Sequence, residues 1–598
     1  MPFDQGSSSL TVETQPLLKD SIPPPYYNSV DDNVVEPSSP IEADPPPPLL
    51  NNFSNVDVAW ILAGLWSAVF LGALGTVVAT LLTPIGSDFN KSNQASYIGT
   101  SYLLSLCCFT PLYGRLADIL GRKGAMLLAL FLFGSGTILC GMVPSMETLI
   151  LARALAGMGG GGQCHDSVDH RGYRFNTTVS AREDDPSQPR VNSVASHLRK
   201  QRGLYQGMAN ILFGLGAGIG GPLGGWINDV FGWRSAFYFQ APMLIFSATL
   251  VTWKVNIELP SDVQDQPLHE KLRRIDVLGS LTLVGTVGCL LLGFSLKTTE
   301  EIPWSHPLIY GLFSASFICG VLFILVEKYW APFPVMPLRL ITRRTPFAVS
   351  VSNLFASMAA FSMLYNVPLY FSAVKLYSAA SSGSHLLPHS VAISCGSVAA
   401  GWMMRRTGKL YTLTLAAAAS SISANLLVIF WNEKTSVWHL WLDIVPQGFG
   451  MASFITTTLI AMIAGVIKED MAVATGITYL FRTTGQVLGV SLSGAILQAV
   501  LLQKLRMRIQ DPRSAEIIYE IRHSAESIRD LDPQWKKAAV DSYADALRAV
   551  FIFQAAMAFL AFLTCLPIEE NPLPGTRQEQ EEHYRNQELD RDNTDDGL

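Results

Sequence analysis

The stretch Gly114-Arg-Leu-Ala-Asp118-Ile-Leu-Gly121-Arg122-Lys123 lies between two long apolar runs, 95–113 and 124–144. Its two flanking glycines permit a tight turn and a close approach of the helices on either side. Asp118 and Arg122 stand one helical turn apart, so they can form a charge latch between the ends of neighbouring helices. The pattern is typical of a short, charged connection between two membrane-spanning helices.

Long stretches on both sides of this connection carry no charge. Of the 598 residues, 49% are apolar and only 15% are charged, whereas soluble domains contain about 25% charged residues. A helix of about 20 mostly apolar residues can span a bilayer. The runs that lack Asp, Glu, Lys and Arg are Val58–Ser87, Gly203–Asn228, Val277–Leu296, Thr345–Val374 and Leu410–Asn432. The sequence therefore predicts an all-α polytopic membrane protein.

The apolar runs resolve into fourteen candidate spans. The predicted spans are 58–83, 95–113, 124–144, 147–164, 204–228, 235–254, 277–297, 307–327, 346–372, 381–404, 410–431, 439–466, 474–502 and 547–567. The loop 503–545 between the last two is long and charged, and long loops escape the rule that places positive charge at the cytoplasmic face.

The basic residues of the short loops predict the orientation. They gather in the loops after spans 2, 6, 8 and 10, whereas the loops after spans 1, 7, 9 and 11 carry one lysine each. Positively charged loops face the cytoplasm, so we expect even-numbered loops and both tails there. Asn90-Lys91-Ser92 is then the sequon expected on the lumenal side and Asn90 the glycosylation candidate, while the sequons at Asn52 and Asn176 stay unmodified.

Both tails are acidic, and the first contains two short signals. Segment 1–56 holds eight acidic residues and one lysine, and 569–598 holds ten acidic residues and three arginines. The Pro- and Ser-rich first tail is expected to be disordered and cytoplasmic. Glu13-Thr-Gln-Pro-Leu17-Leu18 resembles an acidic dileucine sorting signal, and Pro23-Pro24-Pro25-Tyr26 resembles a ligand of WW domains. These signals imply a sorting adaptor and a WW-domain ubiquitin ligase as partners, with solvated linker as the alternative.

The remaining composition excludes several kinds of site. The eight cysteines lie mostly in apolar runs without a CxxC pair, so they are interpreted as small apolar residues rather than disulfides or a metal site. Patterns for ATP binding (GxxxxGK[ST]), zinc proteolysis (HExxH) and a hydrolase nucleophile (GxSxG) are not present. We therefore expect no enzyme, no catalytic residues, no cofactor and no nucleic-acid partner.

The stretch 114–123 resembles the loop 2–3 motif of the major facilitator superfamily, G-x-L-a-D-r-x-G-r-k. A degenerate copy, Gly401-Trp-Met-Met-Arg405-Arg406-Thr-Gly408-Lys409, follows span 10. A second copy is expected of a fold built from two similar halves. With fourteen predicted spans, the chain resembles the drug:proton antiporter family. The resemblance covers residues 57–568 and implies two six-helix halves plus two extra central helices.

Span 5 carries a second motif of this family. Its glycines resemble the glycine-and-proline motif of antiporters, with one glycine inserted and one spacing shortened. The motif residues are Gly207, Gly216, Gly220, Gly221, Pro222, Gly224 and Gly225. Further stretches resemble the fungal branch that includes vacuolar basic amino-acid transporters, namely Arg202–Gly207, Gly232–Phe237 and Tyr479–Gly485.

The chain departs from the family pattern in two places. Relatives often carry an Asp in the first helix, where Leu74-Gly75-Thr76 stands here. After Gly162, relatives continue helix 4, whereas Gln163–Lys200 is polar and has no helical period. We interpret that segment as a gene-model error or a retained intron; a genuine cytoplasmic insertion is the alternative.

Charged and polar side chains at membrane depth are the candidates for coupling, because their burial is costly. Arg153 matches the helix-4 arginine that the family resemblance implicates in proton coupling, since a fixed cation favours ionisation of a nearby acid; a snorkelling structural arginine is the alternative. Arg482, Asp443 and Gln447 complete the set. His385 and His389 share a helix face and would titrate in an acidic lumen, but two histidines alone do not make a metal site.

The resemblance implies a monomeric, proton-driven antiporter working by alternating access in the bilayer. Basic amino acids moved into an acidic vacuole are the preferred substrates. Efflux of drugs across the plasma membrane is the alternative, and a sensor that no longer transports, or a defective gene model, is the third possibility.

Overall fold

The computed structural model is helical throughout the residues it describes. Beyond a few isolated positions, these are residues 74–162, 219–254, 276–299, 305–331, 338–407, 409–432, 434–466, 471–523 and 527–570. The tail signals of 1–56, most of the acidic tail 569–598 and the segment 163–200 lie outside them.

The first part of the chain forms the helices that precede the expected central pair. They are α2 (Thr76–Asp88), η1 (Ser92–Gln94), α3 (Ser96–Met142), a helix at 146–162, a helix whose described end is 219–231, α6 (Trp233–Tyr238) and α7 (Ala241–Lys254). The central pair is α10 (Val277–Thr299) and α11 (Pro307–Leu325), which continues into the π-helical turn η2 (Val326–Trp330).

The second part of the chain is longer. Its elements are α12 (Leu338–Ile341), α13 (Arg344–Ala373), α14 (Ala379–Ser384), α15 (Leu387–Thr407), α16 (Tyr411–Ile429), α17 (Val437–Leu442), α18 (Val445–Ala464), α19 (Met471–Arg508), α20 (Ser514–His523), η4 (Ser527–Arg529) and α21 (Pro533–Cys565). A described helical segment falls on each predicted span, and nine helices among the described residues are long and apolar enough to cross a membrane. The total of fourteen crossings stays a prediction.

The helix α3 contains the reversal that the opening motif predicts. A Cβ placed on Gly162 would lie 2.6 Å from the Cβ of Ala129 and 2.6 Å from Cε1 of Tyr113. In a straight helix residues 113 and 129 would be about 24 Å apart. The chain therefore folds back between them, and both arms pack against the helix 146–162.

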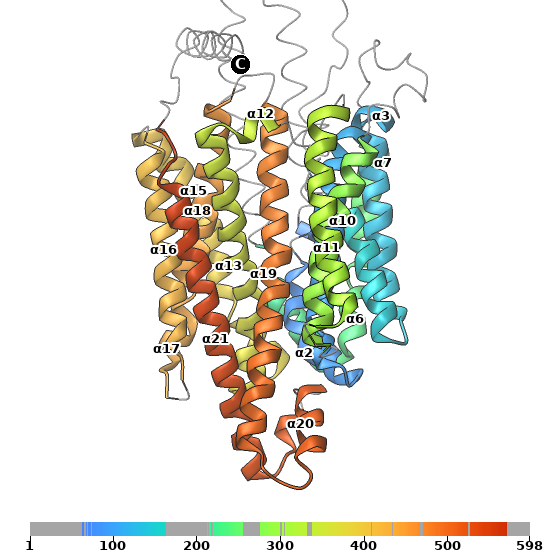
Figure 1. Cartoon of the computed structure of the whole chain (residues 1–598), viewed down its shortest axis with the longest axis vertical. Helices are drawn as coiled ribbons and strands as arrows, with labels where there is room; N and C mark the ends of the chain where they lie inside the picture. The colour runs from blue at the N-terminus through green and yellow to red at the C-terminus, as the bar shows by residue number, and fades with distance from the viewer. Residues whose placement is uncertain are drawn as a thin grey trace, which may run out of the picture. The chain divides into compact units, whose positions relative to one another are not determined.

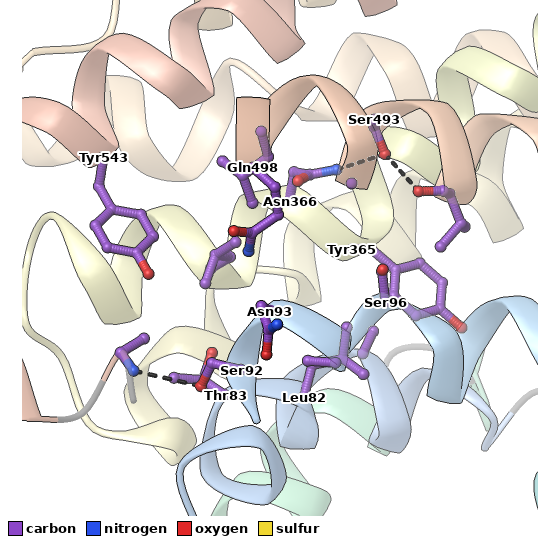
Figure 2. Close-up of a pocket in the computed structure, with 17 residues that line it drawn as sticks. Leu82, Thr83, Ser92, Asn93, Ser96, Tyr365, Asn366, Ser493, Gln498 and Tyr543 are labelled. Carbon is purple, nitrogen blue, oxygen red and sulfur yellow. Dashed lines mark hydrogen bonds between the residues drawn. The ribbon is translucent and has the colours of Figure 1, made fainter. Parts of the chain in front are cut away.

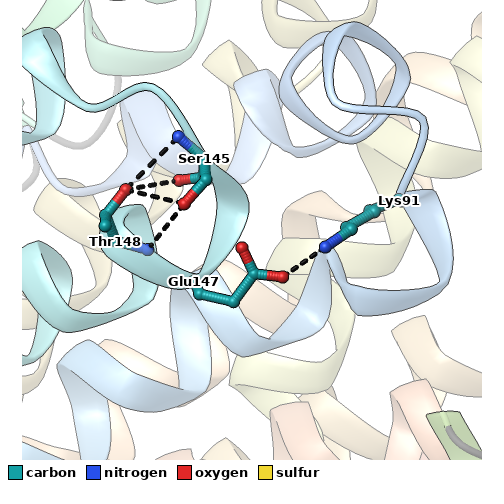
Figure 3. Close-up of polar contacts among 4 residues, drawn as sticks. All are labelled: Lys91, Ser145, Glu147 and Thr148. Carbon is teal, nitrogen blue, oxygen red and sulfur yellow. Dashed lines mark hydrogen bonds and ion pairs between the residues drawn. The ribbon is translucent and has the colours of Figure 1, made fainter.

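Loops that the charge pattern places on one side also lie together in space. Arg529 donates to the carbonyl of Tyr377 at 2.6 Å, and Lys375 Nζ to that of Asn432 at 3.2 Å. Lys91, in the loop after α2, forms an ion pair with Glu147 at the start of the helix 146–162 (Figure 3). This end of the helices, which carries α20, is called the α20 end below (Figure 1). Asn90 lies exposed here, in a left-handed turn with φ of 52°.

Even-numbered loops meet at the opposite, α12 end. Arg344 at the start of α13 pairs with Glu569 at 3.2 Å, and the amide of Leu410 donates to Glu570 at 3.2 Å. The alternation of loops between two ends is therefore present in the described residues, while the assignment of one end to the cytoplasm stays a prediction.

The outer surface of the helices is apolar. Trp253 on α7, Phe317 on α11 and Phe430 after α16 expose 79%, 74% and 74% of their surface. Such side chains would be costly in water over so wide an area, so they mark the surface that faces lipid. The helices α10 and α11 pack on each other, and α10 also contacts α3 and α19, which places the central pair beside both parts of the chain.

Candidate functional site

Close backbone contacts join the first and second parts of the chain near the α20 end. A Cβ on Gly225 would lie 2.5 Å from backbone atoms of Ala379 and Ala380, and one on Gly221 would lie 2.9 Å from the carbonyl oxygen of Gly383. Asp229, one turn beyond Gly225, accepts a hydrogen bond from the amide of Ala380 at 3.2 Å. The glycines of the span-5 motif therefore let this helix lie directly against α14.

A second contact line joins α3 to α13 and α19. Gly99 faces the ring of Tyr365, which a Cβ would approach to 2.6 Å. Ser491 on α19 donates to Thr100 on α3 at 3.2 Å. In the described conformation the two parts of the chain are thus closed against each other near the α20 end.

A small cavity lies on the α20 side of the contact between Gly99 and Tyr365 (Figure 2). It encloses about 60 Å³, room for a few water molecules. Its lining comes from α2, η1 and α3 in the first part and from α13, α19 and α21 in the second. The polar residues of the lining are Thr83, Ser92, Asn93, Ser96, Tyr365, Asn366, Ser493, Gln498 and Tyr543.

The polar groups of this cavity are neutral. Asn366 Nδ2 donates to Ser493 Oγ at 3.1 Å, and Gln498 accepts a hydrogen bond from Arg522 Nε at 3.4 Å. Asn93 Oδ1 is buried and has no hydrogen-bond partner among the described residues. An amide oxygen of this kind can accept from an ammonium or a hydroxyl group. The cavity can therefore solvate a polar ligand, but its described lining supplies no carboxylate to neutralise a cation.

Arg153 is buried in the first part of the chain. Only 4% of its surface is exposed; its Nε donates to the carbonyl of Ile98 at 3.4 Å, and its guanidinium lies over the ring of Tyr102 at 4.3 Å. No Asp or Glu of the described residues lies within ion-pair distance of it. The structure thus buries the arginine among the helices, with no described acid beside it, and its role in coupling stays a prediction.

The other coupling candidates fall into two separate places. Arg482 on α19 is half-buried, with its guanidinium 4.0 Å from the ring of Tyr479. Asp443, between α17 and α18, is 7% exposed and accepts from Trp431 Nε1 at 2.9 Å. Gln447, one turn further, is fully buried and hydrogen-bonded to His389 on α15. Asp443 and Gln447 are therefore neighbours, whereas Arg153 and Arg482 share no contact residue with them.

Most side chains of the charged motif in α3 lie outside the described residues. The side chains of Asp118 and Arg122 and the position of Gly207 lie outside the described residues, so the charge latch stays a prediction. Lys123 is half-buried. Within the described residues, no cluster of three or more metal-ligating side chains occurs.

The cavity residues were not singled out by sequence reasoning. Asn93, Asn366 and Gln498 are uncharged, and a neutral amide in a helix is equally compatible with helix packing. The available signal was that Asn366 and Gln498 each interrupt an apolar stretch, whereas Asn93 stands in a polar loop. That signal is weaker than a buried charge, because many such residues hydrogen-bond their own helix.

Comparisons with known proteins agree with this architecture. The model of the Major Facilitator Superfamily matches residues 65–163 and 189–490. The solved structure of a bacterial homolog to the human lysosomal transporter Spinster, inward-facing and unoccupied, aligns with a TM-score of 0.51 at 13% identity, covering 88% of this chain and 100% of that one. At that identity the likeness concerns the fold alone.

Curated fungal relatives are similar over most of their length. Multidrug resistance protein fnx1 of Schizosaccharomyces pombe is 36% identical, covering 85% of this chain and 92% of its own. The vacuolar membrane amino acid uptake transporter fnx2 of the same yeast is 32% identical, covering 88% and 86%. Vacuolar basic amino acid transporter 1 of Saccharomyces cerevisiae is 30% identical, covering 77% and 82%.

These findings confirm the resemblance of the motifs to the major facilitator superfamily and its fungal branch. The relatives are named as transporters or resistance proteins rather than enzymes. The chain is an integral membrane protein of all-α fold, and it belongs to the Major Facilitator Superfamily.

Proposed function

We propose that this chain is a proton-coupled antiporter that moves basic amino acids into the vacuole in exchange for protons. Similarity to the vacuolar membrane amino acid uptake transporter fnx2 and to vacuolar basic amino acid transporter 1 supports the substrate class. The cavity lined by neutral polar groups from both parts of the chain supports transport as such. Transporters of this architecture bind substrate where their halves meet. The closure made by Gly221, Gly225 and Gly99 is a contact that must open in an alternating-access cycle.

Drug efflux is the second candidate. Multidrug resistance protein fnx1 is 36% identical, and the cavity lining contains no described carboxylate to select a cationic amino acid. A neutral, partly apolar cavity suits amphipathic compounds better than lysine or arginine, so the two functions make opposite predictions about substrate.

Vacuolar vesicles with an imposed pH gradient distinguish these functions. We expect accumulation of labelled lysine or arginine that an uncoupler abolishes, in vesicles with this chain and not in vesicles without it. The double substitution Leu17→Ala and Leu18→Ala tests the localisation separately, because loss of the dileucine signal should move the protein away from the vacuolar membrane. Plasma-membrane residence of the unmodified chain, with drug export and no amino-acid uptake, would favour efflux.

A further inference from the structure

A histidine and a glutamine face each other in the tight contact between α15 and α18. His389 is 8% exposed and Gln447 is fully buried, and His389 Nε2 lies at hydrogen-bond distance from Gln447 Oε1. The contact is close because the next residue is glycine; a Cβ on Gly448 would lie 3.0 Å from Cδ2 of the His389 ring.

The other nitrogen of the His389 ring, Nδ1, has no described hydrogen-bond partner. His389 Nδ1 and Gln447 Nε2 are both buried without a hydrogen-bond partner among the described residues. The glutamine oxygen can only accept, so His389 Nε2 carries the hydrogen of their shared bond. In the neutral ring Nδ1 is therefore a free lone pair, a position that a proton can occupy without breaking any existing contact.

The neighbouring titratable groups are already engaged. His385, at the end of α14, has Nδ1 2.7 Å from the carbonyl of Ser381 and stacks on Phe371 at 4.0 Å and Trp441 at 4.3 Å between ring centroids. On the α17–α18 side, Asp443 is held by Trp431 and by His439 Nδ1 at 3.1 Å. Within this described cluster, His389 alone has a ring nitrogen that is buried and without a hydrogen-bond partner.

We propose that His389 Nδ1 is the proton-carrying atom of the second part of the chain. A proton from the acidic lumen forms an N–H bond at Nδ1, and the ring becomes a cation whose Nε2–H bond to Gln447 Oε1 is strengthened by the charge. The buried positive charge disfavours a cationic substrate in the same half of the transporter, so proton and substrate alternate. Release of the proton to the cytoplasmic side restores the neutral ring. This inference rests on the proposed proton-coupled function.

The test replaces the ring in the full-length chain in vacuolar vesicles. His389→Gln cannot be protonated, so we expect it to lose lysine accumulation driven by the pH gradient while it keeps lysine-for-lysine exchange at equal pH, now independent of pH. The matched control is His385→Gln, which removes an imidazole one turn away whose Nδ1 is already engaged and should keep the pH profile of the unmodified protein.

A second variant keeps the proposal testable if His389→Gln fails to fold. Gln447→Leu keeps the ring but removes the acceptor that stabilises its charged form, so the pH at which exchange is half-maximal should fall by about one unit or less. Accumulation by His389→Gln with the parental pH dependence would overturn the proposal. If His389→Gln lost both exchange and accumulation while the protein was present at normal abundance, the proposal would also be overturned, because the ring would then be structural. If the unmodified protein accumulates no lysine, it is the proposed function that fails.

Discussion

At the scale of single residues, Arg153 is the most informative position, because a guanidinium buried at membrane depth is costly unless it serves a purpose. Its described contacts are a carbonyl and an aromatic face. Both stabilise a cation without neutralising it, so its positive charge remains available to act on protons or substrate nearby.

We therefore expect Arg153→Ala to abolish gradient-driven uptake at unchanged abundance and location. Arg153→Lys should retain part of the uptake, since the ammonium keeps the charge but loses the planar group that lies over Tyr102 and reaches Ile98. Uptake and equal-pH exchange are measured in parallel, and exchange should survive better than accumulation. An Arg153→Ala protein that still concentrates substrate would show that the arginine is structural.

Single residues also show how far sequence reasoning reaches. The depth of Arg153 and the burial of Asp443 followed from the apolar runs around them. The pairing of Gln447 with His389 did not, because it depends on how α15 and α18 pack across a sequence separation of 58. The glycine that makes this contact close, Gly448, has no signature of its own in the sequence.

At the scale of elements, the glycine motif of span 5 acquires a physical role. A helix normally keeps its neighbours about 8–10 Å away, axis to axis, and glycines allow a closer approach. Gly225 lies against the backbone of α14, where no side-chain rotation can make room for a Cβ. The motif could be recognised from sequence, but its partner could not, because α14 lies far along the chain.

Gly225→Val should prevent the close contact between the span-5 helix and α14. We expect transport to be lost while the protein still folds, and the contact line between α3 and α19 to become more accessible from the α20 end. The measurement is the rate at which a maleimide labels Thr100→Cys, a position in that contact line, in the purified protein with and without Gly225→Val. Gly288→Val on α10 is the matched control, because a Cβ there meets nothing within 4 Å. Equal labelling rates in all three proteins would refute this role for the motif.

At the scale of the whole molecule, the all-α membrane fold and the superfamily were predictable, because bilayer thickness and charge placement constrain helix length and orientation directly. The reversal within α3 follows from the glycines and charges of 114–123. The extent of the last helices did not follow: α19 runs to Arg508 and α21 begins at Pro533, well inside the predicted loop 503–545. Charged residues can extend a membrane helix into water, so composition marks where the bilayer ends and not where the helix does.

The segment Gln163–Lys200 is the remaining question at this scale. The described helix 146–162 rises about 25 Å, less than the roughly 30 Å of a bilayer core. Gly162, the last described residue of this helix, packs between the two arms of α3. The sequence that follows it includes His165, Asp166 and Asp169, which are costly to bury in a bilayer. The superfamily model also stops at residue 163 and resumes at 189.

A polar stretch in that place is easier to explain as extra sequence than as part of helix 4. We expect sequencing of transcripts to find a shorter product that resumes near Arg202, and the protein made from it to be more abundant in the membrane than the 598-residue chain, because its fourth helix can cross the bilayer without burying charge. Immunoblots of both products, expressed from matched plasmids, measure that difference. Transcripts that all encode residues 163–200, together with full transport by the longer protein, would establish the segment as a genuine cytoplasmic insertion.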